Sequence, residues 1–172
     1  MKLSKDLILD TTEAMIVAYG FEATTLSKIA KQLDVSHAAL YKYYRNKEDL
    51  FENLALRWLT ETSQALMDWD ATQSQQPLHD WLWQLAMTKK ELYREKTEMF
   101  LLYTQFIEHN EKLVTNHLNE LAAKIETFAE VDGLAMITAF TAFHNPYFAP
   151  RWLRDDHQAA FERVWQVVAP NK

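Results

Sequence analysis

The chain has 172 residues, and 18 Lys plus Arg against 24 Asp plus Glu give it a formal charge of −6. Hydrophobic residues make up 48% of the chain and are spread along its length, which favours one or two small folded domains over long-range disorder. Cysteine is absent, which excludes disulfides, thiol nucleophiles and thiolate metal sites.

The beginning of the sequence has no pattern typical of an export signal. Acidic residues occur within the first ten positions, and no uncharged apolar run is followed by small residues. No window of the sequence approaches the roughly 18 consecutive apolar residues that a membrane span requires. We therefore expect a cytoplasmic protein without membrane association.

Turn-forming residues are scarce. Two glycines and four prolines are too few for many hairpins or for phosphate-binding loops, so the sequence predicts an all-α protein. Residues 4–19 carry apolar side chains at three- and four-residue spacing, and Gly20 provides a left-handed residue at which such a helix ends. The expected buried stripe of this first helix consists of Leu7, Ile8, Thr11, Ala14, Met15, Ala18 and Tyr19.

Two short helices are expected next, each beginning at a hydroxyl residue that can cap it. The Thr24–Thr25 pair precedes an apolar set that ends near Asp34, and Ser36 precedes the next helix. In this third helix Leu40 and Tyr44 form the inward side. Two short helices joined by a tight turn, with a longer helix before them, predict a helix-turn-helix whose second member lies in the DNA major groove.

The local charge supports a DNA-binding segment. Between Thr24 and Lys47 there are five basic residues and one acid, an excess of +4 in a chain of net charge −6. Phosphate attraction acts over short distances, so this local excess matters more than the total. A solvated basic face without a partner is the alternative interpretation.

The run from Gly20 to Phe51, GFEATTLSKIAKQLDVSHAALYKYYRNKEDLF, resembles the N-terminal DNA-binding domain of the TetR family of bacterial transcriptional regulators. The resemblance joins about ten positions at fixed spacing, which is far more specific than a single short motif. These positions are Gly20-Phe21, Thr25, Ile29-Ala30, Val35-Ser36, Leu40-Tyr41 and Lys47 to Leu50. The resemblance implies a three-helix DNA-binding domain over residues 1–48 and a helical ligand-binding and dimerisation bundle over residues 49–172.

The resemblance also implies roles for the matching residues. Thr25, Tyr41 and Lys47 stand where the family holds phosphates, and the exposed positions early in the third helix read base edges. The Lys42 side chain can donate hydrogen bonds to guanine, and the methyl group of Ala38 can contact a thymine methyl. For Lys42, a contact to phosphate alone is the alternative. The expected DNA-contacting residues are Thr25, Ser36, His37, Ala38, Tyr41, Lys42, Tyr43 and Lys47.

This segment departs from the family pattern at three positions. Asp34 stands where the turn usually has glycine, but aspartate tolerates the left-handed conformation better than most residues, so we expect the turn to be kept. Tyr43 replaces a frequent histidine and Tyr44 a frequent phenylalanine. Both substitutes are aromatic, although the hydroxyl of a buried tyrosine needs a partner.

Beyond Phe51 the periodicity predicts a bundle of further helices. Residues 71–76, ATQSQQ, are expected to connect two of them. His117 falls on the apolar stripe of its helix, where a core histidine is the main interpretation and a polar contact for a ligand is the alternative. The expected helices cover residues 47–69, a segment after Pro77, a segment containing Met99 to Ile107, and residues 111–128, 133–144 and 157–168.

Aromatic and histidine side chains in this bundle suggest a small-molecule site, because such sites combine an apolar lining with a few polar groups. Plain core is the alternative for each of them. The six histidines form no HExxH or HxxxH pair, so we expect neither a metal nor another cofactor. The expected ligand-binding residues are Trp81, Phe100, Tyr103, His117, Phe140 and His144.

Residues 133–144 are apolar nearly all round, which indicates burial on two sides and therefore a partner. In the family the last two helices of each subunit form a four-helix dimer interface, which corresponds here to Leu134 to His144 and Phe161 to Val168. A two-fold symmetric operator needs two reading heads. The sequence thus predicts a homodimeric repressor of a palindromic double-stranded DNA operator, released by a small-molecule effector. The alternatives are an activator, a regulator controlled by a protein partner and, with no supporting residue spacing, a helical-bundle enzyme.

Overall fold

A computed structural model describes residues 2–107 and 110–169. The described residues form α-helices, 3₁₀ turns and loops without any strand, so the all-α prediction is confirmed. The chain forms two compact units, the first made of Met1–Glu61 with Lys96–His109 and the second of Thr62–Glu95 with Asn110–Lys172. This division into compact units does not test the boundary expected after residue 48 between the DNA-binding domain and the ligand-binding and dimerisation domain. That boundary stays a prediction.

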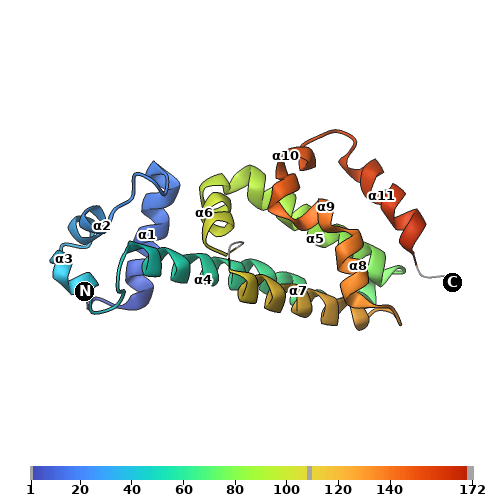
Figure 1. The fold of residues 1–172 in the computed structure, drawn as a ribbon, viewed down its shortest axis with the longest axis horizontal. Coiled ribbons are helices and arrows are strands. Elements are labelled where there is room, and N and C mark those ends of the chain that lie inside the picture. Colours follow the sequence, from blue (N-terminus) through green and yellow to red (C-terminus); the bar gives the residue numbers. More distant parts are fainter. Residues whose placement is uncertain (1, 108–109, 170–172) are drawn as a thin grey trace. The chain divides into compact units, whose positions relative to one another are not determined.

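The first unit contains the three N-terminal helices, most of α4, and α6 (Figure 1). Helix α1 packs against α2 and α6, and α2 packs against α3. The continuous helix α4 extends from the first unit into the second. The helices are α1 (Lys5–Tyr19), α2 (Leu26–Gln32), α3 (His37–Leu40), α4 (Lys47–Met67) and α6 (Thr97–Ile107).

The two ends of α1 follow the sequence prediction. Ser4 caps its beginning, because its Oγ accepts a hydrogen bond from the amide of Leu7 at 3.2 Å. Gly20 ends the helix with a φ of 81°, and its amide donates to the carbonyl of Ile16 at 2.8 Å. An L side chain at this φ would be strained, so glycine is required at this turn.

The predicted buried stripe of α1 is wrong in part. The buried residues are Ile8, Leu9, Thr12, Met15 and Ile16. The helix is rotated so that Ala14, Ala18 and Tyr19 are exposed, and they line an open groove of about 510 Å³ that reaches the end of α2. Both stripes have three- and four-residue spacing, so packing against α2 and α6 selects between them. The Thr12 hydroxyl is satisfied in the core because it donates to the carbonyl of Ile8 at 2.7 Å.

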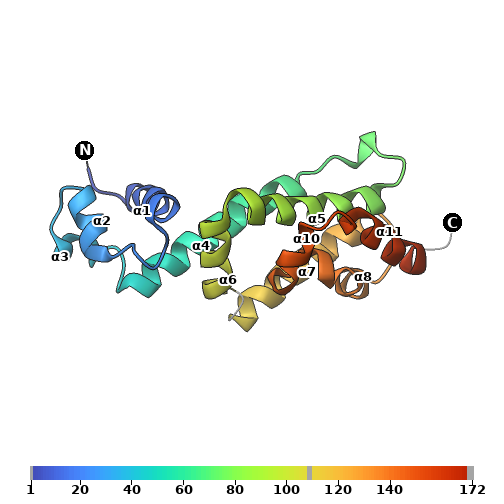
Figure 2. The ribbon, with the colours of Figure 1, turned by 90° about the horizontal axis from the view of Figure 1, so that it is seen from above.

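The second unit is a helical bundle of which Figures 1 and 2 give two views. Helix α7 packs against α8, α8 against α11, and α5 against α9 and α10. Its core contains Trp81, Leu85, Leu121, Phe140 and Phe161 among other buried apolar residues. The elements are η1 (Ala71–Gln73), α5 (Pro77–Glu95), α7 (Glu111–Glu126), α8 (Gly133–Ala139), α9 (Thr141–His144), η2 (Pro146–Phe148), α10 (Ala149–Trp152) and α11 (His157–Val168).

The prediction of a single helix over residues 133–144 is wrong. The helix breaks at Phe140, whose φ of −95° and ψ of 11° separate α8 from α9. The break lets two aromatic rings reach the same partner, since the Phe140 and Phe143 centroids lie 4.9 and 5.4 Å from that of Phe161. No glycine or proline marks the break, so aromatic packing rather than turn chemistry explains it.

Candidate nucleic-acid interface

The helix-turn-helix is formed by local hydrogen bonds that the sequence predicts. The Oγ of Thr25 accepts from the amide of Lys28 at 3.3 Å, and the Oγ of Ser36 accepts from the amide of Ala39 at 3.2 Å. Between the two caps Asp34 has a φ of 55°, the only positive φ of a non-glycine among the described residues. Its left-handed conformation lets α3 begin three residues later in a new direction. The turn prediction is confirmed.

Helix α3 has a buried side and an exposed side. Leu40 at 1% and Tyr44 at 4% exposure hold it against the rest of the first unit, and burial raises the pKa of Tyr44 above its ordinary value. On the outer side the rings of His37 and Tyr41 meet edge to face with centroids 5.1 Å apart. The exposed residues of this segment are Ser36, His37, Ala38, Tyr41 and Lys42. We call these five residues the α3 face.

The expected phosphate-binding residues differ in the hydrogen bonds that their polar atoms already make within the protein. The Thr25 hydroxyl accepts one hydrogen bond as a cap and keeps its own proton to donate. The Nζ of Lys47 lies 3.5 Å from the carbonyl of Phe21 and 4.9 Å from the ring centroid of Phe51, at the beginning of α4. The hydroxyl of Tyr43 donates to the carbonyl of Leu3 at 2.8 Å and is left only as an acceptor.

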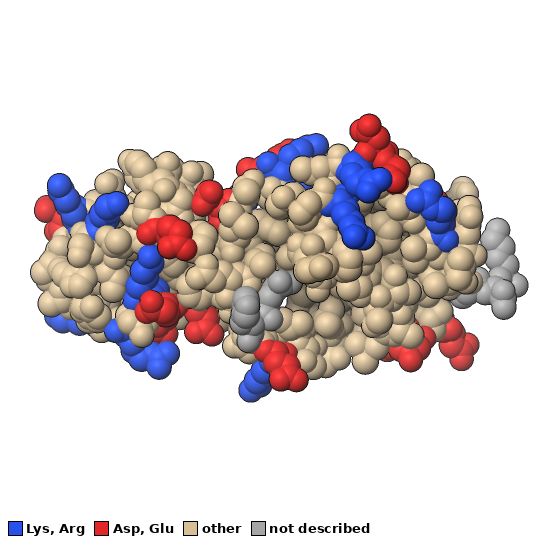
Figure 3. All heavy atoms as spheres, turned by 45° about the horizontal axis from the view of Figure 1, so that its top comes forward, with Lys and Arg blue, Asp and Glu red and all other residues tan. Residues whose placement is uncertain are grey.

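Other basic residues of the segment make contacts that the sequence does not reveal. The Nζ of Lys28 donates to the carbonyl of Ala23 at 2.7 Å. Arg45 pairs with Asp49 at 3.0 Å, and the hydrogen bonds from its side chain and its amide hold the pKa of the Asp49 carboxyl below its ordinary value. Figure 3 shows Lys and Arg side chains on the part of the surface that α1 to α3 form, with acidic side chains between them.

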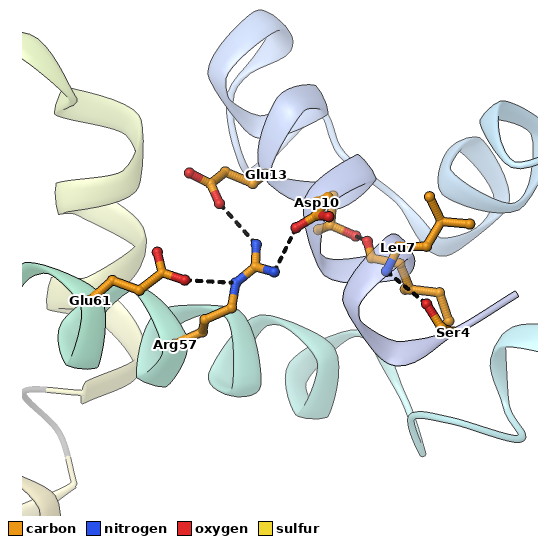
Figure 4. A network of polar contacts seen from close by, with 8 residues as sticks. Ser4, Leu7, Asp10, Glu13, Arg57 and Glu61 are labelled. Carbon is orange, nitrogen blue, oxygen red and sulfur yellow. Dashed lines mark hydrogen bonds and ion pairs between the residues drawn. The ribbon is translucent and has the colours of Figure 1, made fainter.

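Arg57 links α4 to α1 within the first unit (Figure 4). Its Nη1 donates to Asp10 at 2.6 Å, its Nη2 donates to Glu13 at 3.0 Å, and its Nε lies 3.8 Å from Glu61. Helix α1 is the element on which α2 packs, so this guanidinium helps to position the helix-turn-helix on α4. Of these three partners the sequence indicates only Glu61, which follows Arg57 by four residues in the same helix. Asp10 and Glu13 are 47 and 44 residues away along the chain.

The six expected ligand-binding residues are divided between the two units. Phe100 and Tyr103 belong to the first unit, where the centroid of Tyr103 lies 5.8 Å from that of Trp58. Trp81 belongs to the second unit, is fully buried, and donates from Nε1 to the carbonyl of Leu66 at 2.9 Å. Phe140 lies in the core of the second unit. A shared role of the six in binding a ligand stays a prediction.

The remaining two expected ligand residues, His117 and His144, lie in the second unit. His144 is 8% exposed, and its Nε2 hydrogen-bonds to the carbonyl of Ile137 at 3.0 Å. Burial and the positive charge of Lys89 lower the pKa of His144 to about 4, although its hydrogen bond to Ile137 acts in the opposite sense. Burial and the same lysine lower the pKa of His117 to about 3. Both imidazoles are therefore neutral at pH 7.

Within residues 2–107 and 110–169, no group of three or more His, Cys, Asp or Glu side chains is arranged to hold a metal ion. None of the helices in this part of the chain is both long and apolar enough to cross a membrane.

Sequence comparison relates the helix-turn-helix to known regulators. Residues 8–54 match the family model of bacterial regulatory proteins, tetR family. The chain is 33% identical over 60 residues to YhgD of Bacillus subtilis, an uncharacterized HTH-type transcriptional regulator; this match covers 35% of the chain and 31% of YhgD. It is 36% identical over 47 residues to IcaR of Staphylococcus epidermidis, the negative transcriptional regulator of the biofilm operon icaADBC, covering 27% of the chain and 25% of IcaR. The matches thus span about a third of these relatives or less.

Structural comparison extends the likeness to the whole chain. The TetR-family regulator HI0893 of Haemophilus influenzae superposes with a TM-score of 0.63 at 17% identity over 94% of both chains. SmeT of Stenotrophomonas maltophilia, the repressor of the multidrug efflux pump SmeDEF, gives a TM-score of 0.61 at 17% identity over 96% of this chain and 90% of SmeT. At such identities the likeness shows the fold. Residues 8–54 thus match the tetR family of bacterial regulatory proteins at the helix-turn-helix, and the chain as a whole shares the fold of these solved regulators.

Proposed function

We propose that this protein is a cytoplasmic, sequence-specific DNA-binding transcriptional regulator that represses by occupying a palindromic operator as a homodimer. The α3 face is the observation that carries the proposal. Leu40 and Tyr44 hold α3 by its inner side, while Lys42 and its neighbours remain exposed in the position where a recognition helix meets the major groove. A short helix and turn with a purely structural role need no such exposed cationic and aromatic residues.

Within this proposal the residues divide into two roles. His37, Ala38 and Lys42 read base edges, since His37 and Ala38 are exposed at the beginning of α3 and Lys42 is exposed in the turn that follows it. Residues around them hold phosphates and fix the register of α3 in the groove. The phosphate-contacting set is Thr25, Ser36, Tyr41, Tyr43 and Lys47, in which the Tyr43 hydroxyl must exchange its hydrogen bond to the carbonyl of Leu3 for one to a phosphate.

Dimerisation is proposed for the outer sides of α8, α9 and α11. Residues 133–144 contain no charged residue, yet Leu134 is 48% exposed in the single chain. On α11 Phe161 is fully buried while Val167 is 84% exposed. The uncharged segment 133–144 and the exposed apolar Val167 fit a second copy of the chain better than they fit water. The other exposed residues of α8 and α9 are Ala135, Thr138, Ala139 and Ala142.

The sign and the control of regulation come from the relatives and from the proposed ligand residues. IcaR is a negative regulator by name and SmeT a repressor, which supports repression here. Release requires an effector that binds the free and the DNA-bound conformations unequally, because equal binding shifts no equilibrium. We assign that effector to the second unit, with Trp81 and Phe140 as its apolar contacts and His117 and His144 as its polar contacts.

Affinity selection of random duplex DNA on the purified full chain tests the proposal without knowledge of the effector. We expect enrichment of a palindrome whose half-sites are about one helical turn, or a multiple of it, apart. Recovery of no preferred sequence at low salt, from protein that is folded and dimeric, would contradict operator recognition.

A further inference from the structure

Helix α1 carries a stripe of residues that the first unit does not bury. Leu7, Thr11, Ala14 and Ala18 follow one another at spacings of four, three and four residues, so they lie on one side of the helix. Leu7 and Thr11 are partly buried, and the two alanines are exposed. We call these four residues the α1 seam. Their pattern predicts burial from the sequence, yet the fold of the single chain leaves them uncovered.

The α1 seam forms one wall of the open groove of about 510 Å³. Leu33 and Asp34, at the end of α2 and in the turn after it, contribute to the opposite wall. Met15 and Tyr19 add apolar surface from α1. All residues that line the groove belong to the first unit, and apart from two aspartates they are uncharged. The groove is therefore a mainly apolar surface that is open to solvent.

The charge of the groove has one sign. Asp10 and Asp34 line it, and no lysine or arginine of the described part of the chain does. Asp10 accepts a hydrogen bond from Arg57, which compensates part of its charge. Within residues 2–107 and 110–169 the exposed carboxylate of Asp34 makes no hydrogen bond or ion pair. An occupant that brings positive charge beside an apolar surface complements this groove.

The shape of the α1 seam fits a helix. From residue 7 to residue 18 it extends over three turns, or about 16 Å along the axis of α1. Alternating spacings of three and four residues form the surface on which a second helix packs its own apolar stripe. The small side chains of Ala14 and Ala18 allow a second helix to approach closely. A second copy packed through the same groove would offer no cation to Asp10 or Asp34, so the charge favours a different, basic partner.

We propose that the groove between α1 and the end of α2 binds an amphipathic α-helix of a partner protein, which packs apolar side chains on the α1 seam and places Lys or Arg beside Asp10 and Asp34. Asp34 forms the turn of the helix-turn-helix, so this partner contacts the segment that sets the direction of α3. The inference goes beyond the proposed function, because it adds a protein partner on the DNA-binding unit and depends on neither the operator nor the effector.

A synthetic peptide that carries the proposed chemistry tests the groove in the full chain without DNA. The peptide is a helix of about 18 residues with leucine at heptad positions a and d and lysine at positions e and g, where like charges oppose its pairing with itself. Its twin has glutamate in place of each lysine. We expect the lysine peptide to shift the backbone amide resonances of Leu7, Ala14 and Ala18 in NMR spectra, and the glutamate twin to leave them unchanged.

Two variants of the groove, each with a matched control, connect the binding to its residues. Ala14→Gln places a longer polar side chain in the α1 seam and should weaken binding about tenfold or more. Ala123→Gln, the same change at an exposed residue of α7, should bind the peptide as the unchanged protein does. Asp34→Asn removes the charge but keeps a residue that tolerates the left-handed turn, and should weaken binding about two- to fivefold. Asp6→Asn, at an exposed residue of α1 outside the groove, should not weaken it.

Three results would overturn the proposal. The first is an absence of shifts at the α1 seam with the lysine peptide, and the second is equal binding of this peptide by folded Ala14→Gln. The third is a loss of the protein's own dimer in Ala14→Gln, measured by sedimentation equilibrium, because the occupant of the groove would then be a second copy. Operator selection uses no peptide and peptide binding uses no DNA, so failure of either test leaves the other conclusion in place.

Discussion

The imidazole of His79 on α5 joins the carboxylate of Glu162 on α11, with 3.1 Å between Nε2 and Oε1. Its other nitrogen, Nδ1, lies 2.8 Å from Oδ1 of Asp80. The same ring packs edge to face on Phe161 and Trp165, with centroids 5.6 and 5.1 Å away. A histidine between two carboxylates therefore fixes α11, which carries part of the proposed dimer surface, to the beginning of α5.

This contact gives a pH dependence of known sign. Burial lowers the pKa of His79, but the hydrogen bonds and charges of Asp80 and Glu162 outweigh burial and raise the pKa above 6.5. The stabilisation is thus complete below pH 6.5 and is lost as the pH rises through the folded-state value. Glu162→Gln should lower the pKa of His79 in an NMR titration. It should also lower the free energy of unfolding at pH 6 by about 1 kcal/mol or less, since Glu162 is 38% exposed and screened by solvent.

Glu120→Gln provides the control for this charge change, because Glu120 is an exposed residue on α7 of the same unit. It should leave the His79 titration where it is. A His79 titration that is the same in Glu162→Gln as in the unchanged protein would refute the assigned contact.

Acid should destabilise the second unit through His117 and His144. Their pKa values of about 3 and about 4 lie below 6.5. As the pH falls below 6.5, both histidines are therefore protonated in the unfolded chain before they are protonated in the folded protein. Stability is therefore complete above pH 6.5 and falls as the pH drops toward 4, opposite in sign to the effect of His79. Each histidine should cost about 2 kcal/mol between pH 7 and pH 5. Denaturant unfolding at the two pH values measures the loss, and His117→Asn should reduce it by one histidine's share.

The exposed His37 supplies the control for the acid effect. His37→Asn should leave the difference in unfolding free energy between pH 7 and pH 5 unchanged. If His117→Asn also leaves it unchanged, the assignment of the acid sensitivity to His117 is wrong.

Gly133 sets the distance between α7 and α8. A Cβ at this position would lie 2.7 Å from the carbonyl carbon of Ala122 and closer still to its oxygen, and a backbone atom cannot move aside as a side chain can. Gly133→Ala should therefore lower the free energy of unfolding by about 2 kcal/mol, measured by denaturant titration. Ala123→Ser changes an exposed neighbour of Ala122 and should be nearly neutral. Unchanged stability of Gly133→Ala would show that the two helices are less closely packed than the structure has them.

Leu134 is the exposed residue through which the proposed dimer surface is most easily disrupted. Leu134→Arg places a charge in the uncharged segment 133–144 of the proposed interface, so it should convert the dimer into a monomer in sedimentation equilibrium. Leu153→Arg is a close match, since Leu153 is 49% and Leu134 48% exposed. Leu153 lies in the same unit but outside the proposed surface, so the Leu153→Arg variant should remain dimeric. A dimer of undiminished stability in Leu134→Arg would exclude this surface.

The helix-turn-helix was predictable because its determinants are local. Thr25 and Ser36 cap the amides three residues ahead of them, and Asp34 supplies the left-handed turn within the same segment. Leu40 at the end of α3 and Tyr44 in the segment after it are both buried, as the sequence predicts, although α3 ends before Tyr44. Each feature depends on residues within one or two turns of helix, which is the range over which sequence patterns are informative.

What the sequence did not reveal depends on distant segments. The orientation of α1 is chosen by packing between two stripes of equal spacing, and the break at Phe140 follows from its contact with Phe161. Arg57 and His79 acquire their roles from partners 47 and 83 residues away. The periodicity of α5 places Lys89 among its buried residues. The burial of Lys89 is nevertheless missed when every lysine is assumed to be solvated. Long-range pairs of this kind carry no signal in a single sequence.

The equilibrium affinity for the selected operator, measured across a range of salt concentrations, tests most directly whether the α3 face recognises DNA. Tyr41→Ala combined with Lys42→Ala should weaken operator binding by about 1–3 kcal/mol or more and reduce the salt dependence, because one base contact and at least one phosphate contact are lost. Tyr147→Ala combined with Lys112→Ala removes an equally charged, exposed pair from the second unit and should bind as the unchanged protein does. If the α3-face variant binds the operator as tightly as this control, with the same salt dependence, α3 is not the recognition helix.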